Sequence, residues 1–365
     1  MNQPVINKSI IGLDQGSAVR DGEALDHAAV TQWLQQQGIA LSGPPMVSQF
    51  TGGASNWTYR LQYAERDLIL RRPPAGTKAK GAHDMGREYR VQSALKQAFP
   101  TVPTMVGWCQ DTSVIGCEFY VMERIAGIIP RRRMPKGMTL SAVQNQQLCQ
   151  NMLDQLLALH QVDIHATGLD ALGKGDGYVE RQISGWSKRF EQAWTDNVTR
   201  GQTVMQWLAR HQPTDVANCL IHNDWRLDNL ILDPHDPTHV IGVLDWEMAT
   251  LGDPLMELGN LLAYWIEADD NPLFKLVQRQ PSDLDGMMSR AEIVEYYLSR
   301  SPYQISDFSF YEVYGLFRLA VIVQQIYYRY HHGQTQNPQF KDFWIVTNYL
   351  FERCERIMYQ ARAKS

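Results

Sequence analysis

Residues 221–232 read Ile-His-Asn-Asp-Trp-Arg-Leu-Asp-Asn-Leu-Ile-Leu. They contain the spacing H-x-D-x-x-x-x-N, formed by His222, Asp224 and Asn229, and they end in an apolar run that predicts a short strand. A second apolar run, Ile-Gly-Val-Leu, leads directly into another acid, Asp245. Two short strands that lie close together in the sequence are therefore flanked by three oxygen-bearing side chains.

This set of side chains suits phosphoryl transfer. Such a reaction needs one carboxylate to orient the attacking hydroxyl group and take its proton, and further oxygen ligands to hold Mg²⁺ on the nucleotide phosphates. We therefore expect Asp224 to be the catalytic base, and Asn229 and Asp245 to be the metal ligands. The alternative is a β-hairpin whose turn is rich in Asp and Asn, residues that turns favour. The position of Asp245 directly after an apolar strand favours the catalytic interpretation.

The composition argues against several other classes of protein. The chain has 365 residues, with 34 Lys and Arg against 39 Asp and Glu, and so a net charge of −5. This mildly acidic balance, without a long basic run, argues against a nucleic-acid partner. No apolar stretch reaches the roughly 20 residues that a membrane helix needs, so no membrane partner is expected. Five cysteines without metal-ligand spacing indicate reduced thiols, and the expected location is cytoplasmic.

The order of the predicted elements divides the chain into two lobes. Residues 1–22 carry few periodic apolar positions and are expected to be poorly ordered. The segment 23–123 alternates short β-prone runs with turn residues and contains one main helix near 83–98. Residues 124–128 form a connector, and 129–365 are mostly helical. The expected fold is therefore α+β and bilobal, with a small antiparallel sheet in the first lobe and a larger helical second lobe.

Taken together, these motifs make the sequence similar to the aminoglycoside phosphotransferase and choline kinase branch of the protein-kinase-like fold. The resemblance runs from about residue 49 to residue 332, and it is greatest to the small-molecule kinases that also occur fused to acyl-CoA dehydrogenases. It implies ATP and Mg²⁺ as cofactors and the same roles for the two aspartates and the asparagine. It further implies structural roles for His222 and Asp253.

A nucleotide lobe of this kind also needs a cation on a strand, to meet phosphate, and a carboxylate on a helix, to hold that cation. Arg71 lies at the end of an apolar strand and is the candidate cation. On the predicted helix, Glu88 shares a face with Val91 and Leu95, and a charge on such a face is costly to bury alone. We therefore expect Glu88 to pair with Arg71; the alternative is a solvated glutamate. The family usually has lysine where this chain has arginine, although arginine is common in the resembling subgroup.

Two backbone segments complete the expected nucleotide site. In the glycine-rich turn between the first two strands, the backbone of Gly52 and Gly53 and the hydroxyl group of Ser55 would lie over the phosphates. By resemblance, the backbone of the connector near Glu123 and Ile125 would hydrogen-bond the adenine ring. The sequence leaves open whether ATP or GTP is preferred.

The acceptor is expected to be a small molecule with a hydroxyl group. A hydroxyacyl-CoA or similar metabolite is favoured by the subgroup resemblance alone. The three arginines at 131–133 are typical of a solvated turn; the minority hypothesis is that they meet the phosphates of coenzyme A. Aminoglycosides are polycations and would need a dense acidic pocket, whereas choline or another amino alcohol would need an aromatic cage. The non-enzyme alternative is a catalytically inactive nucleotide-binding scaffold, against which the retained oxygen ligands weigh. The oligomeric state stays open.

Overall fold

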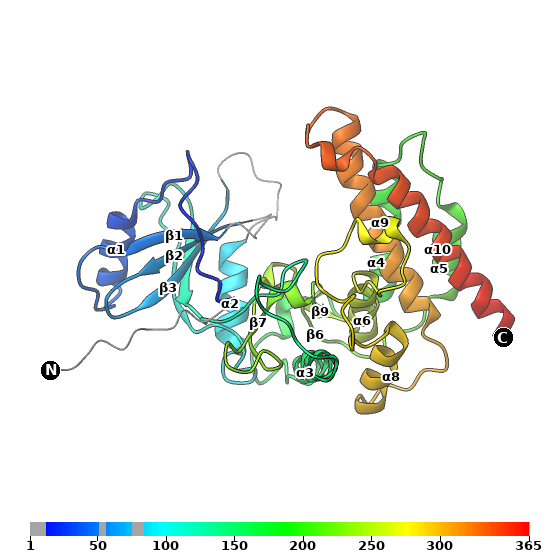
Figure 1. Cartoon of the computed structure of the whole chain (residues 1–365), viewed down its shortest axis with the longest axis horizontal. Coiled ribbons are helices and arrows are strands. Elements are labelled where there is room, and N and C mark those ends of the chain that lie inside the picture. Colours follow the sequence, from blue (N-terminus) through cyan, green and yellow to red (C-terminus); the bar gives the residue numbers. More distant parts are fainter. Residues whose placement is uncertain (1–11, 51–55, 75–83, 365) are drawn as a thin grey trace. The chain divides into compact units, whose positions relative to one another are not determined.

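The structure is a computed structural model, and it describes residues 12–50, 56–74 and 84–364. The chain forms two compact units (Figure 1). The first unit consists of residues 1–129, 135–138 and 230–247. The second unit consists of residues 130–134, 139–229 and 248–365. A sheet with antiparallel pairing in the first unit and a set of helices in the second confirm the expected α+β class.

A five-stranded antiparallel sheet forms the centre of the first unit, in the strand order β1-β2-β3-β5-β4. The strands are β1 (Met46–Phe50), β2 (Trp57–Gln62), β3 (Asp67–Arg72), β4 (Met105–Cys109) and β5 (Phe119–Glu123). The central strand β3 is buried along Leu68, Ile69, Leu70 and Arg71 in succession. Burial without alternation means that both faces of this strand are covered.

Two helices cover the two faces of the sheet. Helix α1 (His27–Gln36) shares one core cluster with Leu68 and Leu70, whereas α2 (Met85–Leu95) shares a second cluster with Ile69. Side chains alternate between the faces of a strand, so neighbouring residues of β3 enter different cores. The chain therefore folds here into three layers, with the sheet between the two helices.

Residues 230–247 belong to the first unit, although they follow much of the second unit in the sequence. They form an antiparallel hairpin of β7 (Leu230–Leu232) and β8 (Val240–Val243). A bridge joins Leu232 to Ile128, and the N–H group of Val243 donates to the carbonyl oxygen of Thr101 at 2.8 Å. Backbone hydrogen bonding therefore joins this hairpin to the segments that precede β4 and follow β5 in the first unit.

Residues 12–22, which the sequence predicts to be poorly ordered, are instead held by the first unit. Leu13 bridges to Ile128, and Ser17 bridges to Gln49 with reciprocal backbone hydrogen bonds of 2.8 Å. Backbone pairing of this kind needs no apolar periodicity, which explains why the sequence pattern gave no sign of it. Residues 1–11 lie outside the described residues.

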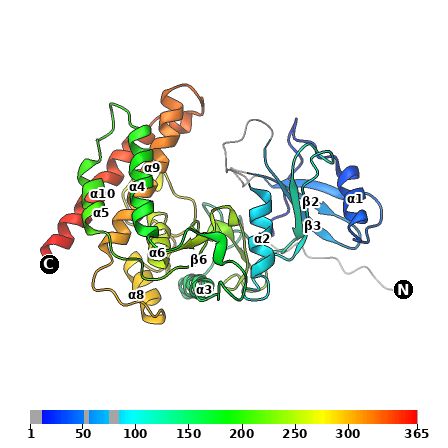
Figure 2. The same ribbon diagram turned by 180° about the vertical axis from the view of Figure 1, so that it is seen from behind.

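Helices make up most of the second unit. They are α3 (Ala142–His160), α4 (Tyr178–Gln192), α5 (Gln202–His211), α6 (Pro254–Ala263), α7 (Pro272–Lys275), α8 (Arg290–Arg300), α9 (Ser309–His331) and α10 (Phe343–Lys364). Helix α9 is central, and α4, α5, α6 and α10 pack against it (Figure 2). Where α6 and α9 meet, a Cβ atom added to Gly315 would lie 2.0 Å from the carbonyl oxygen of Gly259. Glycine is therefore needed for the two backbones to approach each other.

Two short strands, β6 (Cys219–Ile221) and β9 (Thr250–Gly252), pair antiparallel in the second unit. Strand β6 ends directly before His222, so it delivers the chain into the segment that carries Asp224 and Asn229. In the part of the chain that the structure describes, no helix is both long and apolar enough to cross a membrane.

Candidate active site

The alternation of side chains along β3 places Arg71 on the same side of the sheet as Ile69, which is the side that α2 covers. In the strand register Arg71 lies opposite Tyr120 of β5. The guanidinium Nη2 atom lies 3.6 Å from Oε2 of Glu88 on α2 and 3.2 Å from Oδ1 of Asp245. One arginine therefore holds two carboxylates, one on a helix and one after the β7–β8 hairpin.

Glu88 is 1% exposed, and the side chains of three residues meet its carboxylate, one of them Arg71. Tyr120 donates its hydroxyl hydrogen to Oε2 at 2.8 Å, and the Asn56 amide donates to Oε1 at 3.1 Å. Burial raises the pKa of Glu88, and Arg71 and Tyr120 act in the opposite direction. For Arg71, burial opposes the charged form, but Glu88 and Asp245 favour it, and its pKa lies above the usual range.

Asp245 follows β8 with a left-handed backbone, at φ 65°. Asn223 has φ 68°, and these two are the non-glycine residues with positive φ among those described. Such a backbone is uncommon for a residue with a side chain, although Asn and Asp adopt it most readily, and it is concentrated at functional sites. One such residue directly precedes Asp224, and the other is the predicted metal ligand. The sequence gave no sign of either conformation.

The segment between β6 and β7 fixes the side chain of Asp224. The amide of Asn229 donates to the carbonyl oxygen of Asp224 at 2.8 Å and to its Oδ2 atom at 2.9 Å. Arg226 donates to Oδ1, so both carboxylate oxygens have a donor. The Asp224 side chain remains 21% exposed. The carboxylate is therefore held in one orientation while part of its surface stays open to a ligand.

Arg226 contacts the candidate base Asp224, and sequence reasoning missed it. Its Nε atom also donates to Oδ1 of Asp228 at 2.8 Å, and its guanidinium lies 4.9 Å from the ring centre of Tyr264. Burial opposes its charge, but Asp224 and Asp228 more than offset this effect, and the pKa of Arg226 lies above the usual range. The available signal was its place between two acids in a segment flanked by apolar runs.

Glu257 of α6 accepts hydrogen bonds from the backbone at the start of this segment. Its carboxylate is fully buried and accepts the N–H group of His222 at 3.0 Å and the N–H group of Asn223. It also lies 2.8 Å from Nε2 of His160, whose Nδ1 lies 2.6 Å from the hydroxyl group of Tyr297. A buried network of this kind fixes the start of the segment that carries Asp224.

His222 itself is fully buried, and its Nδ1 accepts the N–H group of Asp224 at 3.3 Å, which is a contact within the segment. Asp253, for which the resemblance implied a bracing role, caps α6 by accepting the N–H groups of Leu255 at 2.8 Å and Met256 at 3.0 Å. It also accepts the N–H group of Val216 at 2.7 Å. Asp253 therefore fixes the helix that carries Glu257 rather than the segment itself.

The predicted metal ligands each keep one oxygen free of hydrogen bonds to the described residues. Asn229 donates two hydrogen bonds to Asp224 from its amide nitrogen, which leaves its amide oxygen for a cation. Asp245 receives Arg71 on Oδ1, and its side chain is 30% exposed. Carboxylate and amide oxygens suit Mg²⁺, which typically takes one or two protein ligands beside phosphate and water. The described residues contain no group of three or more His, Cys, Asp or Glu placed to hold a metal ion.

The predicted nucleotide contacts are described only in part. Gly52, Gly53 and Ser55 lie outside the described residues. The N–H group of Glu123 donates to the carbonyl oxygen of Thr104 at 2.8 Å. The backbone of Ile125, in contrast, makes no hydrogen bond to a described residue. Its N–H and carbonyl groups are therefore available for an adenine ring, whereas the N–H group of Glu123 is not.

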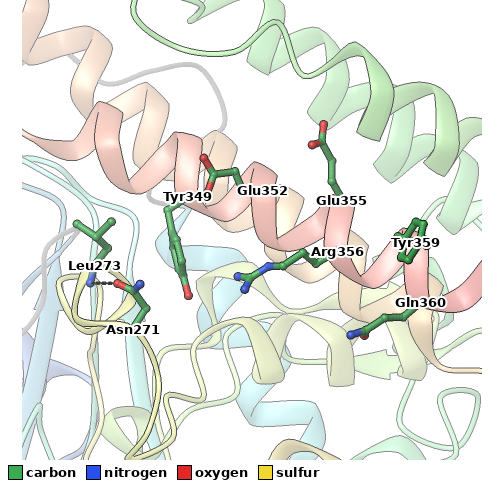
Figure 3. Close-up of a pocket in the computed structure, with 8 residues that line it drawn as sticks. All are labelled: Asn271, Leu273, Tyr349, Glu352, Glu355, Arg356, Tyr359 and Gln360. Atoms are coloured by element: carbon green, nitrogen blue, oxygen red, sulfur yellow. Dashed lines mark hydrogen bonds between the residues drawn. The ribbon is translucent and has the colours of Figure 1, made fainter.

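A groove of about 690 Å³ runs along α10 in the second unit (Figure 3). Glu352, Glu355 and Arg356 line it from α10, with Arg356 pointing toward the side on which Asn271, the residue before α7, lies. The Asn271 side chain is occupied, because it accepts the N–H group of Leu273 at 2.9 Å. None of the predicted site residues lines this groove, so it is separate from the residues described above.

Comparison with known proteins supports the resemblance that the sequence suggested. The phosphotransferase enzyme family matches residues 47–292 of the chain. Acyl-CoA dehydrogenase family member 10 of Mus musculus is 34% identical over 345 residues, which cover 94% of this chain and 32% of that protein. The chain thus spans about a third of the length of the curated relatives that it matches.

Solved structures agree with this assignment. A protein from Ralstonia eutropha that carries the provisional description of an aminoglycoside phosphotransferase is 30% identical, with a TM-score of 0.76 over 91% of this chain and 99% of that one. The GDP complex of aminoglycoside 2'-phosphotransferase-IIIa has a TM-score of 0.60 at 13% identity, over 90% of this chain and 99% of that one, and so shares the fold alone. The bilobal fold expected from the sequence is confirmed.

Proposed function

Because this chain belongs to the phosphotransferase enzyme family, we propose that it transfers the γ-phosphoryl group of ATP to a hydroxyl group of a small molecule. The observation that carries the proposal is the geometry around Asp224. Both oxygens of this carboxylate are held, by Arg226 and Asn229, while the side chain stays partly exposed on a segment that Glu257 supports. Catalysis of this reaction depends mainly on positioning and electrostatic stabilisation, and a carboxylate held in one orientation contributes to the positioning.

In the proposed step, the acceptor oxygen forms a bond to the γ-phosphorus, and the bond from that phosphorus to the bridging oxygen of ADP breaks. The acceptor proton passes to a carboxylate oxygen of Asp224. Asn229 and Asp245 are proposed to hold Mg²⁺ through the oxygens that the described residues leave free. The ion, when bound, neutralises charge on the phosphates.

Arg71 is proposed to contact a phosphate oxygen of the nucleotide while Glu88 holds its guanidinium in place. A planar fork can serve two partners at once, and here it already reaches both Glu88 and Asp245. The backbone near Glu123 and Ile125 is proposed to bind the adenine ring, and Gly52, Gly53 and Ser55 the phosphates. A phosphotransferase fold found in complex with GDP supports a purine nucleotide as the donor.

For the acceptor we favour a hydroxyacyl-CoA or a similar hydroxylated metabolite. The support is that curated relatives across most of this chain are named acyl-CoA dehydrogenase family members. The exposed arginines 131–133 are proposed to contact the phosphates of coenzyme A. Arg133→Glu should then weaken the binding of a hydroxyacyl-CoA but not the binding of the free hydroxy acid. Aminoglycosides and amino alcohols are the alternative acceptors. The alternative to phosphoryl transfer itself is a catalytically inactive nucleotide-binding scaffold.

A panel of acceptors tests the proposal. Hydroxyacyl-CoAs, amino alcohols and aminoglycosides are offered side by side with Mg·ATP, and ADP formation and phosphorylated product are measured. Nucleotide binding is followed separately by Mg²⁺-dependent thermal shift. We expect turnover with a hydroxyacyl substrate and none with Asp224→Asn. Nucleotide binding without turnover of any acceptor would favour the scaffold.

A further inference from the structure

Arg318 on α9 is a buried cation without a carboxylate partner. The residue is 6% exposed, and its guanidinium stacks 5.3 Å from the ring centre of Trp186. Its one hydrogen bond to a described residue runs from Nη2 to the carbonyl oxygen of Asn223, at 3.3 Å. No carboxylate of the described residues lies within ion-pair distance of it. A buried charge without a partner of opposite charge is costly. The described residues supply no such partner to this guanidinium, so a bound ligand could supply it.

The acids around Asn223 are already engaged. The carboxylate of Glu257 accepts hydrogen bonds from the backbone N–H groups of His222 and Asn223 and contacts Nε2 of His160. Asp224 is held by Arg226 and by the amide of Asn229. None of these carboxylates is therefore free to turn toward Arg318 without losing its own donors.

Arg318 lies on the side of the catalytic segment where other cations gather. Its bond partner, Asn223, directly precedes Asp224. Tyr264, whose ring lies 4.9 Å from the guanidinium of Arg226, has a pKa that burial raises and that Arg226 and Arg318 lower. A third guanidinium, that of Arg279, lies 3.9 Å from Asp228 and is largely exposed. Arg226 and Arg279 are paired with Asp224 or Asp228, so among these three guanidinium groups Arg318 is the one without a carboxylate partner.

We propose that Arg318 binds an acyl oxygen of the acceptor, either the carboxylate of a hydroxy acid or the carbonyl oxygen of its thioester. A guanidinium donates well to both groups, and an anionic oxygen would also neutralise its buried charge. Polycationic acceptors would meet like charges here, which disfavours them. The inference rests on the proposed function in one respect, namely that Asp224 marks the place of the acceptor hydroxyl group.

The test compares three acceptors with the same carbon skeleton: 3-hydroxybutanoate, its coenzyme A thioester, and 1,3-butanediol, which lacks the acyl oxygen. For Arg318→Gln we expect kcat/KM to fall by about 10- to 100-fold with an acyl acceptor, mostly through KM, and by less than about 3-fold with the diol. Arg318→Lys keeps the charge and should recover part of the loss with the carboxylate. Equal losses with all three acceptors would mean that Arg318 only braces Asn223, and would overturn the proposal.

A matched control variant is Arg189→Gln. Arg189 stacks 4.5 Å from the ring centre of the same Trp186 but is exposed, so its loss removes a similar ring contact without touching the buried cation. We expect no change in acceptor preference. If Arg189→Gln changed the preference as much as Arg318→Gln does, the effect would come from Trp186 packing and the inference would fail.

Calorimetric binding of the three acceptors without nucleotide separates this inference from the proposed function. If the wild type binds an acyl acceptor and Arg318→Gln does not, while no phosphorylated product forms, Arg318 is an acyl-binding residue and phosphoryl transfer fails. If product forms but Arg318→Gln leaves the acceptor preference unchanged, phosphoryl transfer stands and the Arg318 inference fails. Should Arg318→Gln not fold, the preference measured with Arg318→Lys decides instead.

Discussion

Each of the two units buries a glutamate among its own candidate residues, and the two units satisfy these carboxylates in different ways. In the first unit, Glu88 is met by side chains: the guanidinium of Arg71, the hydroxyl group of Tyr120 and the amide of Asn56. In the second unit, Glu257 accepts two backbone N–H groups and the ring of His160. Both carboxylates are at most 1% exposed.

This difference predicts different sensitivities. The site residues of the first unit depend on side chains that a sheet register and a helix bring together, so a single substitution can leave a charge buried alone. The segment that carries Asp224 depends on backbone donors, which substitution of a side chain does not remove. We therefore expect side-chain substitutions within residues 222–229 to affect chemistry more than folding, and substitutions of Arg71 or Glu88 to affect both.

The largest expected effect is on turnover, from Asp224→Asn. Removing the base should lower kcat by about 10³-fold, within the range that general base catalysis contributes. The backbone of the segment stays bound to Glu257, so folding and nucleotide affinity should be retained. Steady-state kinetics and Mg·ATP calorimetry provide the measurements.

Asp228→Asn is the matched control, because it removes a carboxylate from the same segment and from the same arginine, Arg226. We expect a much smaller loss of kcat. Similar losses in the two variants would mean that the orientation of Arg226, and not a base at Asp224, limits turnover.

The next effect is on stability, from Arg71→Met compared with Arg226→Met. Each arginine lies between two carboxylates, but Glu88 is 1% exposed, whereas the side chains of Asp224 and Asp228 are 21% and 11% exposed. Arg71→Met should lower the free energy of unfolding by about 4 kcal/mol, since it leaves a buried charge unpaired. Arg226→Met should cost about 1 kcal/mol, because water can reach its acids. Urea denaturation measures both.

The double variant Arg71→Met/Glu88→Gln checks the reason. Removing the charge of Glu88 should recover part of the stability that Arg71→Met loses, since the amide keeps an acceptor for Tyr120. If the double variant were no more stable than the single variant, an unpaired Glu88 would not be the cause. Equal costs for the two single arginine variants would contradict the comparison itself.

A pH effect tests the backbone-held acids of the second unit. Burial raises the pKa of Asp253 to about 6, and backbone N–H groups from three residues oppose this shift. In the unfolded chain the group titrates near 3.9. Between pH 6 and pH 4 the folded state therefore binds more protons, and stability from this group rises as the pH falls, by up to about 3 kcal/mol.

Asp253→Asn cannot titrate and should lack this contribution. The difference in free energy of unfolding, wild type minus variant, should therefore grow on going from pH 7 to pH 4. Other groups titrate in both proteins and cancel in the difference. If this difference stayed constant over the range, or became smaller toward pH 4, burial would not raise the pKa of Asp253 in the folded protein.

The same contrast explains what could be predicted from the sequence. The pairing of Arg71 with Glu88 follows from two periodicities, because an apolar strand that ends in a cation and a helix face that contains one acid leave few other partners. The order of Asp224, Asn229 and Asp245 is a local pattern with a chemical reason. The sheet, its covering helices and the residues that bear oxygen ligands could therefore be expected from the sequence.

Contacts made by the backbone could not. Glu257 meets the N–H groups of His222 and Asn223, and an N–H group is present whatever the side chain, so no residue type marks the partner. The positive φ of Asn223 leaves no sequence signal either. Arg318 lies on a helix whose apolar pattern predicts only burial, and the contact with Asn223 depends on how α9 packs. Tertiary packing, and not local preference, decides these features.

The smallest effect on stability that we predict is that of Asp245→Ala. Asp245 differs from Glu88 because it is partly exposed. Its side chain is 30% exposed and shares Arg71 with Glu88, so Asp245→Ala should leave the free energy of unfolding within about 1 kcal/mol of the wild type. If Asp245 is a Mg²⁺ ligand as proposed, its loss should nevertheless weaken Mg·ATP binding by about tenfold and leave binding of ATP in EDTA unchanged. Calorimetry with and without Mg²⁺ separates the two. An equal loss in EDTA would assign Asp245 to the positioning of Arg71, and would make the first unit a phosphate-binding site in which Asp245 has no part in holding the metal.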